Sequence, residues 1–201
     1  MLQTAYSLFL FLRDATGGDF VTWLDWTLSE ADRTTGANRG ERLARAVVEP
    51  MSHIYGVSYK VLTMSLSLLL LAGDPKRERW RAAGSAMIAV DTLVHNWLHR
   101  SGILNRLNAA HTYGIACYRE NGCAEILARL PAMIDATKFN PSFPKSFPRF
   151  VQHAIWNFCS QPGLDICNGN RIDDLTRCAN TACPLFDRCD RIALRKPDLT
   201  S

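Results

Sequence analysis

Four of the seven cysteines in the chain lie close together near its C-terminal end: Cys167, Cys178, Cys183 and Cys189. Thiolates are soft ligands, and four of them can form a closed zinc site or hold an iron–sulfur cluster. The spacing C-x10-C-x4-C-x5-C lacks the two paired knuckles that are typical of zinc sites. The cysteine run therefore predicts a bound metal and leaves open which metal it is, with Cys159 as a substitute ligand.

Composition suggests where such a site would operate. The chain has 201 residues, 47% of them hydrophobic, which is enough for one domain or two joined lobes with a real core. The number of cysteines is odd, and no signal peptide is visible. The apolar run from Val61 to Ala72 is too short to cross a membrane. We therefore expect a cytoplasmic protein with reduced thiols, which would be nucleoid-associated in a bacterium. The net charge of +4 is compatible with a polyanionic partner, and we expect a monomer without a membrane partner.

The elements that must position the metal ligands are predicted to be helices throughout. Apolar residues recur at helical spacing, no convincing strand alternation occurs, and three prolines rule out a helix between Phe139 and Pro148. The fold class is therefore all-α, with helices expected over residues 4–13, 20–29, 41–54, 59–71, 91–100, 105–118, 124–137 and 150–159.

Two further features could carry chemistry. Residues 53–60 read as a tight glycine-containing turn between two helices, and the free N–H groups of such a turn can hold a backbone phosphate of nucleic acid. Asp91 interrupts an apolar run at the start of a helix, where aspartate is a strong N-cap. Taken singly, each feature also has a purely structural explanation, because helix hairpins and aspartate caps are common in all-α proteins.

Taken in order, the hairpin, the aspartate and the cysteine run resemble the helix–hairpin–helix DNA glycosylases of the endonuclease III superfamily. In that family the hairpin reads L-P-G-V-G-x-K, the aspartate lies in V-D-T, and the chain ends in C-x6-C-x2-C-x5-C around a [4Fe–4S] cluster. Here residues 56–60 match G-V-G-x-K with Ser58 in place of the second glycine, residues 90–92 match V-D-T, and Cys183 and Cys189 keep the final C-x5-C. Ile54 and Tyr55 replace Leu-Pro, and the earlier cysteine gaps are longer.

The resemblance implies a fold of two lobes: residues 1–88, with the hairpin at about 50–72, and residues 89–201, with the cluster. Such a protein would bind double-stranded DNA and flip a modified base into a pocket. Lys60 would attack the sugar C1′ as an amine, and Asp91 would stabilise the charge that develops there and deprotonate the nucleophile. The protein would then be a DNA glycosylase with AP lyase activity, and Lys60 and Asp91 would face one cleft. The four thiolates would hold a [4Fe–4S] cluster, with zinc as the alternative. The residues that would bind DNA phosphates are Gly56, Val57, Ser58, Arg188 and Arg191, with Arg177 and Arg195 nearby.

Several alternatives stay open. Asp91 could activate water in a monofunctional glycosylase, or the chain could be a non-catalytic, metal-stabilised DNA-binding protein or a zinc-stabilised interaction module. A competing alignment places the hairpin near Gly73, which would remove Lys60 from the site. His95 and His99 share a helix face at a spacing that can bind metal, but no acidic partner is evident and no second metal site is predicted. Cys117 and Cys123 are expected to be core or free thiols.

Overall fold

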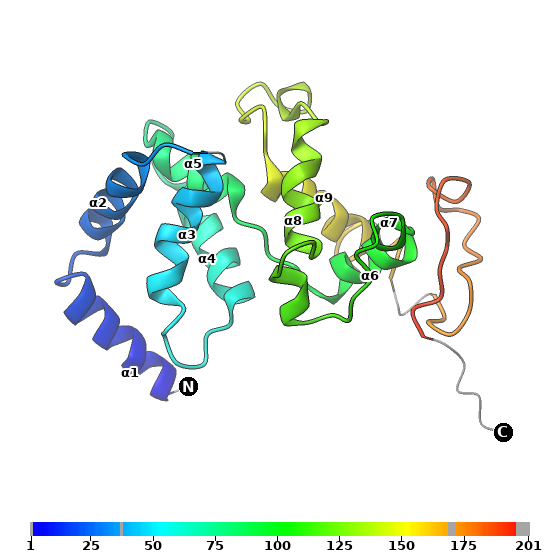
Figure 1. The fold of residues 1–201 in the computed structure, drawn as a ribbon, viewed down its shortest axis with the longest axis horizontal. Helices are drawn as coiled ribbons and strands as arrows, with labels where there is room; N and C mark the ends of the chain where they lie inside the picture. The colour runs from blue at the N-terminus through cyan, green and yellow to red at the C-terminus, as the bar shows by residue number, and fades with distance from the viewer. Residues whose placement is uncertain (1, 37, 169–171, 196–201) are drawn as a thin grey trace. The chain divides into compact units, whose positions relative to one another are not determined.

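The structure, a computed structural model, describes residues 2–36, 38–168 and 172–195. All regular secondary structure within these ranges is helical, and no strand occurs in them (Figure 1). The all-α class predicted from the sequence is therefore confirmed.

The chain divides into two compact units that are interleaved in the sequence. Unit 1 contains Met1–Ala89 and Pro131–Arg149, and unit 2 contains Val90–Leu130 and Phe150–Ser201. The break after Ala89 lies one residue from the expected end of the first lobe. Residues 131–149, expected in the second lobe, belong instead to unit 1. Each unit is described by itself.

Three helices of unit 1 begin at a residue whose side chain caps the helix. Asp19, Asn38 and Ser58 each precede a helix and accept a hydrogen bond from the amide three residues later, which satisfies one of the free N–H groups at the helix start. The helices are α1 (Leu2–Leu10), which continues into a π-helical turn (Phe11–Ala15), α2 (Phe20–Asp32), α3 (Arg39–Met51), α4 (Tyr59–Ala72) and α5 (Glu78–Ala86).

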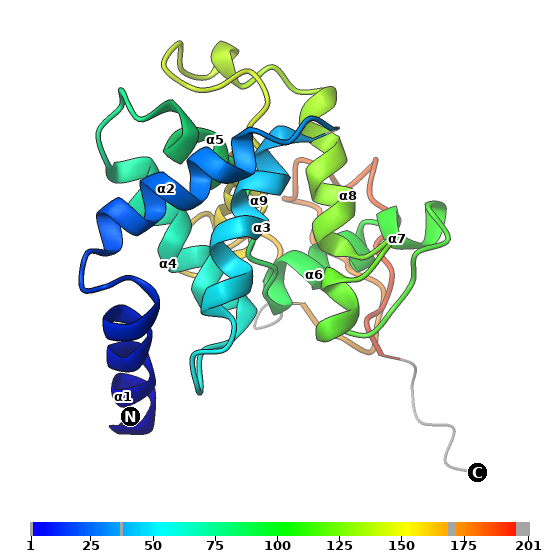
Figure 2. The ribbon, with the colours of Figure 1, turned by 60° about the vertical axis from the view of Figure 1, so that its left-hand side comes forward.

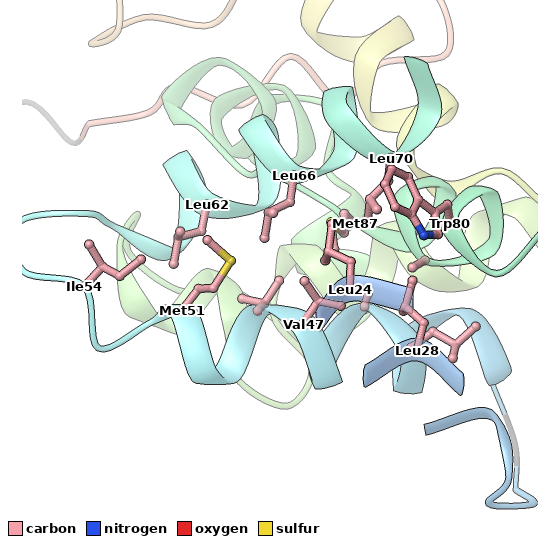
Figure 3. Packing of buried hydrophobic residues seen from close by; sticks show 14 residues of the cluster. Leu24, Leu28, Val47, Met51, Ile54, Leu62, Leu66, Leu70, Trp80 and Met87 are labelled. Atoms are coloured by element: carbon pink, nitrogen blue, oxygen red, sulfur yellow. The ribbon is translucent and has the colours of Figure 1, made fainter. Parts of the chain in front are cut away.

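The core of unit 1 lies between α2, α3, α4 and α5. Figure 3 shows a row of buried side chains that runs from Ile54, in the connection between α3 and α4, to Trp80 on α5. Leu62, Leu66 and Leu70 recur every four residues along α4, so they share its buried face. Both α3 and α4 pack closely against α5, which therefore helps to hold the two helices together.

The helix α4 matches the apolar run noted in the sequence. Only one face of it is buried, since Leu68 and Leu69 on the other side are 62% and 45% exposed. In the ranges that the structure describes, no helix combines the length and the apolar character needed to cross a membrane.

An ion-pair network joins the ends of three helices in unit 1. The Asp32 carboxylate at the end of α2 accepts two hydrogen bonds from the Arg39 guanidinium on α3, at 2.6 and 2.7 Å. Arg39 also donates to Glu78 on α5, and Arg79 donates to Asp32 at 3.1 Å. Hydrogen bonds from Arg39, helped by Arg79, hold the pKa of Asp32 at about 2.

Replacing Asp32 with Asn is expected to lower the free energy of unfolding by about 1 kcal/mol at neutral pH, because Arg39 is partly exposed and solvent weakens the pair. The pKa of Asp32 is lowered by folding, so its contribution is complete above about pH 4 and is lost as the pH falls toward about 2. Urea unfolding should show the difference between the two proteins narrowing across that window. Glu49→Gln is the control, since Glu49 and Arg45 are exposed and 3.8 Å apart; an equal effect in both variants would contradict the prediction.

Unit 2 has shorter helices and long irregular connections. Its helices are α6 (Thr92–Arg100), α7 (Ile103–Arg106), a 3-10 turn (Ile115–Tyr118), α8 (Cys123–Arg129) and α9 (Pro148–Cys159), the last of which begins at the unit boundary. The chain after α9, orange to red in Figure 1, is irregular in its described part.

Two predicted helices of this region are wrong or shortened. Residues 105–118 form no continuous helix: α7 ends at Arg106, Asn108 has a φ of 52°, and Gly114 has a φ of 141°. Such positive φ values break a helix. The helix expected over 124–137 ends at Arg129 and is followed by two 3-10 turns, Leu130–Ala132 and Ala136–Lys138. The helix expected to start at Asp91 and the one expected over 150–159 are present.

Candidate metal centre and the residues around it

The connection between α3 and α4 has the backbone geometry of a tight turn. Gly56 has a φ of +73°, a left-handed conformation that glycine adopts without strain, and the Val57 amide donates to the Ile54 carbonyl at 3.3 Å. Ser58, at the position of the family's second glycine, serves as the N-cap of α4 and accepts from the Val61 amide at 3.3 Å. A tight turn containing Gly56, Val57 and Ser58 therefore joins α3 to α4, and its role as a phosphate-binding hairpin stays a prediction.

The helix α1 contacts this turn. The Tyr55 amide donates to the Ser7 hydroxyl at 3.0 Å, so this N–H is not available to a phosphate. A Cβ on Gly56 would lie 2.8 Å from the Thr4 hydroxyl oxygen, so the turn and α1 approach closely at the glycine. The N-terminal helix therefore covers one side of the hairpin.

Lys60 is the second residue of α4 and is partly buried. Its backbone carbonyl accepts from the Thr63 hydroxyl, and its ammonium forms no ion pair with any residue that the structure describes. Lys60 belongs to unit 1 and Asp91 to unit 2, so the expectation that they face one cleft stays a prediction.

Asp91 is the N-cap of α6. Its Oδ1 accepts from the Val94 amide at 2.9 Å, and its backbone φ of −112° and ψ of −178° are those of a capping residue. Among the described residues, no hydrogen bond to Oδ2 is found. One oxygen therefore maintains the helix start, and the other has no hydrogen-bond partner among the described residues.

Two tyrosines from the connection between α7 and α8 lie at this helix start. The Tyr118 hydroxyl accepts from the Val90 amide at 2.9 Å and lies 3.1 Å from the Val90 carbonyl oxygen. Burial, followed by the negative charge of Asp91, raises the pKa of the Tyr113 hydroxyl. The connection therefore holds the residue before Asp91 directly.

The same connection brings together four residues that could hold a metal ion. His95 from α6, His111 from the loop, Cys117 from the 3-10 turn and Cys123 at the start of α8 have ligand atoms that all lie within 4.8 Å of one another. Figure 2 shows the chain between α7 and α8 returning alongside α6, which places these residues together. No other His, Cys, Asp or Glu residues in the described ranges form such a group.

The contacts inside this group are direct. His95 Nδ1 lies 3.3 Å from Cys123 Sγ and 3.5 Å from Cys117 Sγ, and His111 Nε2 lies 3.3 Å from Cys123 Sγ. Hydrogen bonding to Cys123 lowers the pKa of the Cys117 thiol, whereas the same contact and burial raise the pKa of Cys123. The titrations of the two thiols are therefore linked.

This group was missed from the sequence. Cys117 and Cys123 are fully buried, as expected of core thiols, but they face two imidazoles. The histidine pair suggested by helical spacing, His95 and His99, is not the pair that converges: the ring centroids are 6.5 Å apart, and His95 instead lies 5.1 Å from His111. The available signal was Cys-x5-Cys downstream of two histidines.

The thiols of the cysteine run gather near the end of α9. Cys159 is fully buried and hydrogen-bonded to Cys167. Burial, followed by the charges of Cys167, Cys183 and Cys178, raises the pKa of the Cys189 thiol. None of these thiols forms a group tight enough to share one ion within the described residues. Cys159, the predicted substitute ligand, is therefore in direct contact with Cys167, the first thiol of the run.

The irregular segment is anchored on the corner between α6 and α7. The Arg100 carbonyl accepts from the Ile192 amide at 2.9 Å and from the Cys189 thiol at 3.6 Å. The Arg100 guanidinium is buried and donates to Asp174 at 2.8 Å, while its Nη1 has no hydrogen-bond partner. The charge of Arg100 also lowers the pKa of Cys167, after the hydrogen bond from Cys159.

The arginines proposed to grip phosphates differ in their surroundings. Arg188 is exposed, as are Arg177 and Arg195. The Arg191 guanidinium stacks over the Phe186 ring at 4.2 Å, and its Nε is buried without a hydrogen-bond partner. Arg188 is therefore the more accessible of the two predicted DNA contacts.

Comparison of the chain with protein-family models, curated protein sequences and solved structures found no match.

Proposed function

We propose that the protein is a DNA glycosylase with AP lyase activity that excises a modified base from double-stranded DNA. The observation that carries the proposal is Asp91, which caps α6 with one carboxylate oxygen and leaves the other without a partner among the described residues. The order of hairpin, V-D-T and cysteine run, which resembles the endonuclease III superfamily, supplies the reaction class.

The hairpin supports DNA binding. Its turn is closed by Gly56 in a left-handed conformation, as a tight turn between two helices requires, and the N-terminus of α4 follows at once. Gly73, the competing position, has a φ of −69° and does not form such a turn. The geometry therefore favours Gly56–Lys60 as the phosphate-binding turn, although the Tyr55 amide is already occupied by Ser7.

Asp91 would act on the sugar and the nucleophile. As the bond between the base and C1′ breaks, positive charge develops on the sugar, and the free carboxylate oxygen can stabilise it. The same oxygen can accept the proton of the attacking group. With Lys60 as nucleophile, its amine nitrogen bonds to C1′ as the bond from C1′ to the base breaks. The C1′–O4′ bond then opens, with the proton of the amine passing to O4′, and leaves a Schiff base at C1′. Loss of a C2′ proton expels the 3′ phosphate, which breaks the strand 3′ to the abasic site.

The cysteine run supports an iron–sulfur cluster better than zinc. Two thiolates on one zinc ion must lie about 4 Å apart, because each Zn–S bond is about 2.3 Å long. The thiols of the run form no group of that tightness, whereas the ligands of a four-iron cluster bind different iron atoms. The buried, unpartnered Nη1 of Arg100 suits a negatively charged cluster. Cys167, Cys178, Cys183 and Cys189 would hold it, with a structural role.

Replacing Lys60 with Ala is expected to reduce the covalent adduct trapped by borohydride on abasic-site DNA by at least about tenfold, because the amine that forms the Schiff base is gone. Base excision should fall less, since Asp91 can still activate water. The adduct is measured by denaturing gel electrophoresis after reduction. Lys76→Ala, at an exposed lysine of the same unit, is the control and should trap normally.

The outcomes separate the candidate functions. Equal trapping by wild type and Lys60→Ala would show that an amine other than Lys60 forms the Schiff base. Excision by the wild type with neither trapping nor strand cleavage would indicate a monofunctional glycosylase. Binding of duplex DNA without excision, in a screen of duplexes with different modified bases, would favour a non-catalytic DNA-binding protein. Neither binding nor excision would reject the DNA-repair proposal.

A further inference from the structure

We propose that His95, His111, Cys117 and Cys123 bind one zinc ion, separate from the metal of the cysteine run. Bond lengths of about 2.3 Å to sulfur and 2.0–2.1 Å to nitrogen place neighbouring ligands of a tetrahedral zinc about 3.6 Å apart. The measured nitrogen-to-sulfur distances are 3.3, 3.5 and 3.3 Å. The four ligand atoms therefore already surround a space of the size of a zinc site, and two thiolates with two imidazoles are a common zinc ligand set.

One ligand is already oriented for metal binding. His111 Nδ1 lies 2.7 Å from the Ala109 carbonyl oxygen, so this nitrogen carries the proton and Nε2, which faces Cys123, has a free lone pair. A backbone carbonyl that fixes the tautomer of a histidine is the usual arrangement around a metal ligand. The hydrogen bond thus directs the imidazole toward the site.

The backbone is also shaped to bring the two thiols together. A Cβ on Gly122 would lie 2.4 Å from the Ala116 carbonyl oxygen and 2.7 Å from that of Cys117, so only glycine permits this approach. The approach sets the 3-10 turn against the start of α8. Cys117 and Cys123 consequently meet although five residues separate them.

Apart from the hydrogen bonds of Tyr118, the segment between α7 and α8 has few apolar contacts that hold it. It contains no α-helix, and several of its large apolar side chains are exposed: Leu107 by 56%, Tyr113 by 43% and Ile115 by 74%. A segment that buries so little apolar surface needs another source of stability, and a bound metal that cross-links its ligand residues can supply it. Three of the four ligands are buried and all four come from the protein, so the site is closed and structural.

The site can be tested on the unmodified, tag-free protein by elemental analysis and zinc-edge X-ray absorption. We expect one zinc ion per chain with two sulfur ligands at about 2.3 Å and two nitrogen ligands at about 2.0 Å. Absence of stoichiometric zinc from protein expressed in zinc-supplemented medium would overturn the proposal. So would a shell of four sulfur ligands, which would place the zinc in the cysteine run.

Variants provide a second measurement. His111→Gln should lose most of the bound zinc and unfold at a lower temperature, whereas His99→Gln, on the same helix as His95, should keep the zinc. If His111→Gln does not fold, the ligand shell of the unmodified protein still decides the question. Zinc retained in both folded variants would reject His111 as a ligand. Because iron content and base excision are measured separately, failure here leaves the proposed function untouched.

Discussion

Replacing Asp91 with Asn is expected to lower the rate of base excision at least about 100-fold while the protein stays folded. A positioned acid or base contributes about 10²–10⁴ to a rate, and the amide can neither accept the proton nor balance the developing charge. Asparagine caps helices as well as aspartate does, so the hydrogen bond from the Val94 amide to the side chain at residue 91 can persist. The substitution therefore separates the catalytic role from the capping role.

The rate is measured under single-turnover conditions on the duplex that the substrate screen identifies. Asp19→Asn is a matched control, because Asp19 caps α2 with the same three-residue geometry, accepting from the Thr22 amide at 3.0 Å. Both variants should unfold at temperatures close to that of the wild type. Wild-type excision by Asp91→Asn would show that Asp91 is only a cap and would remove the central support of the proposed function.

Local signals in the sequence predicted the parts of the fold that local chemistry determines. Asp91 followed by an apolar periodic run predicts α6, and the structure begins this helix at Thr92 with Asp91 as cap. The apolar run from Val61 to Ala72 predicts a helix, which is α4, and Gly56 predicts a turn before it. In each case residues close in sequence interact with one another, so the pattern can be recognised without the rest of the chain.

The candidate zinc site depends on interactions that are distant in sequence. Its ligands come from a helix, a loop, a 3-10 turn and a helix start, and they meet only because residues 107–122 turn back on α6. The apolar residues of this stretch suggested a helix, but Asn108 and Gly114 adopt positive φ values that end it. No local sequence pattern predicts this reversal of the backbone. Nor does any local pattern predict that His95 lies beside His111 and not beside His99.

Replacing Arg100 with Met is expected to be the most damaging change in unit 2. Arg100 is 3% exposed, its guanidinium is paired with Asp174, and its Nη1 is buried without a partner. Its positive charge also lowers the pKa of Cys167, after the hydrogen bond from Cys159. Methionine fills much of the same volume but leaves Asp174 unpaired and the thiolates without a compensating charge. Breaking a buried pair costs about 3–5 kcal/mol, and because Asp174 is partly exposed we expect about 3 kcal/mol.

The same substitution should lower the iron content and the visible absorbance of the purified protein, because the negative charge of the proposed cluster is no longer balanced. Arg106→Met is the matched control: Arg106 pairs with Asp190 of the same segment but is 56% exposed, so its loss should cost about 1 kcal/mol or less and leave the iron in place. Chemical unfolding gives the stability of each variant, and iron analysis gives the occupancy. Equal stability and equal iron content in the two variants would show that the buried guanidinium does not stabilise the cysteine run. Loss of iron in Arg100→Met alone would show that Arg100, at the corner between α6 and α7, helps to retain the cluster.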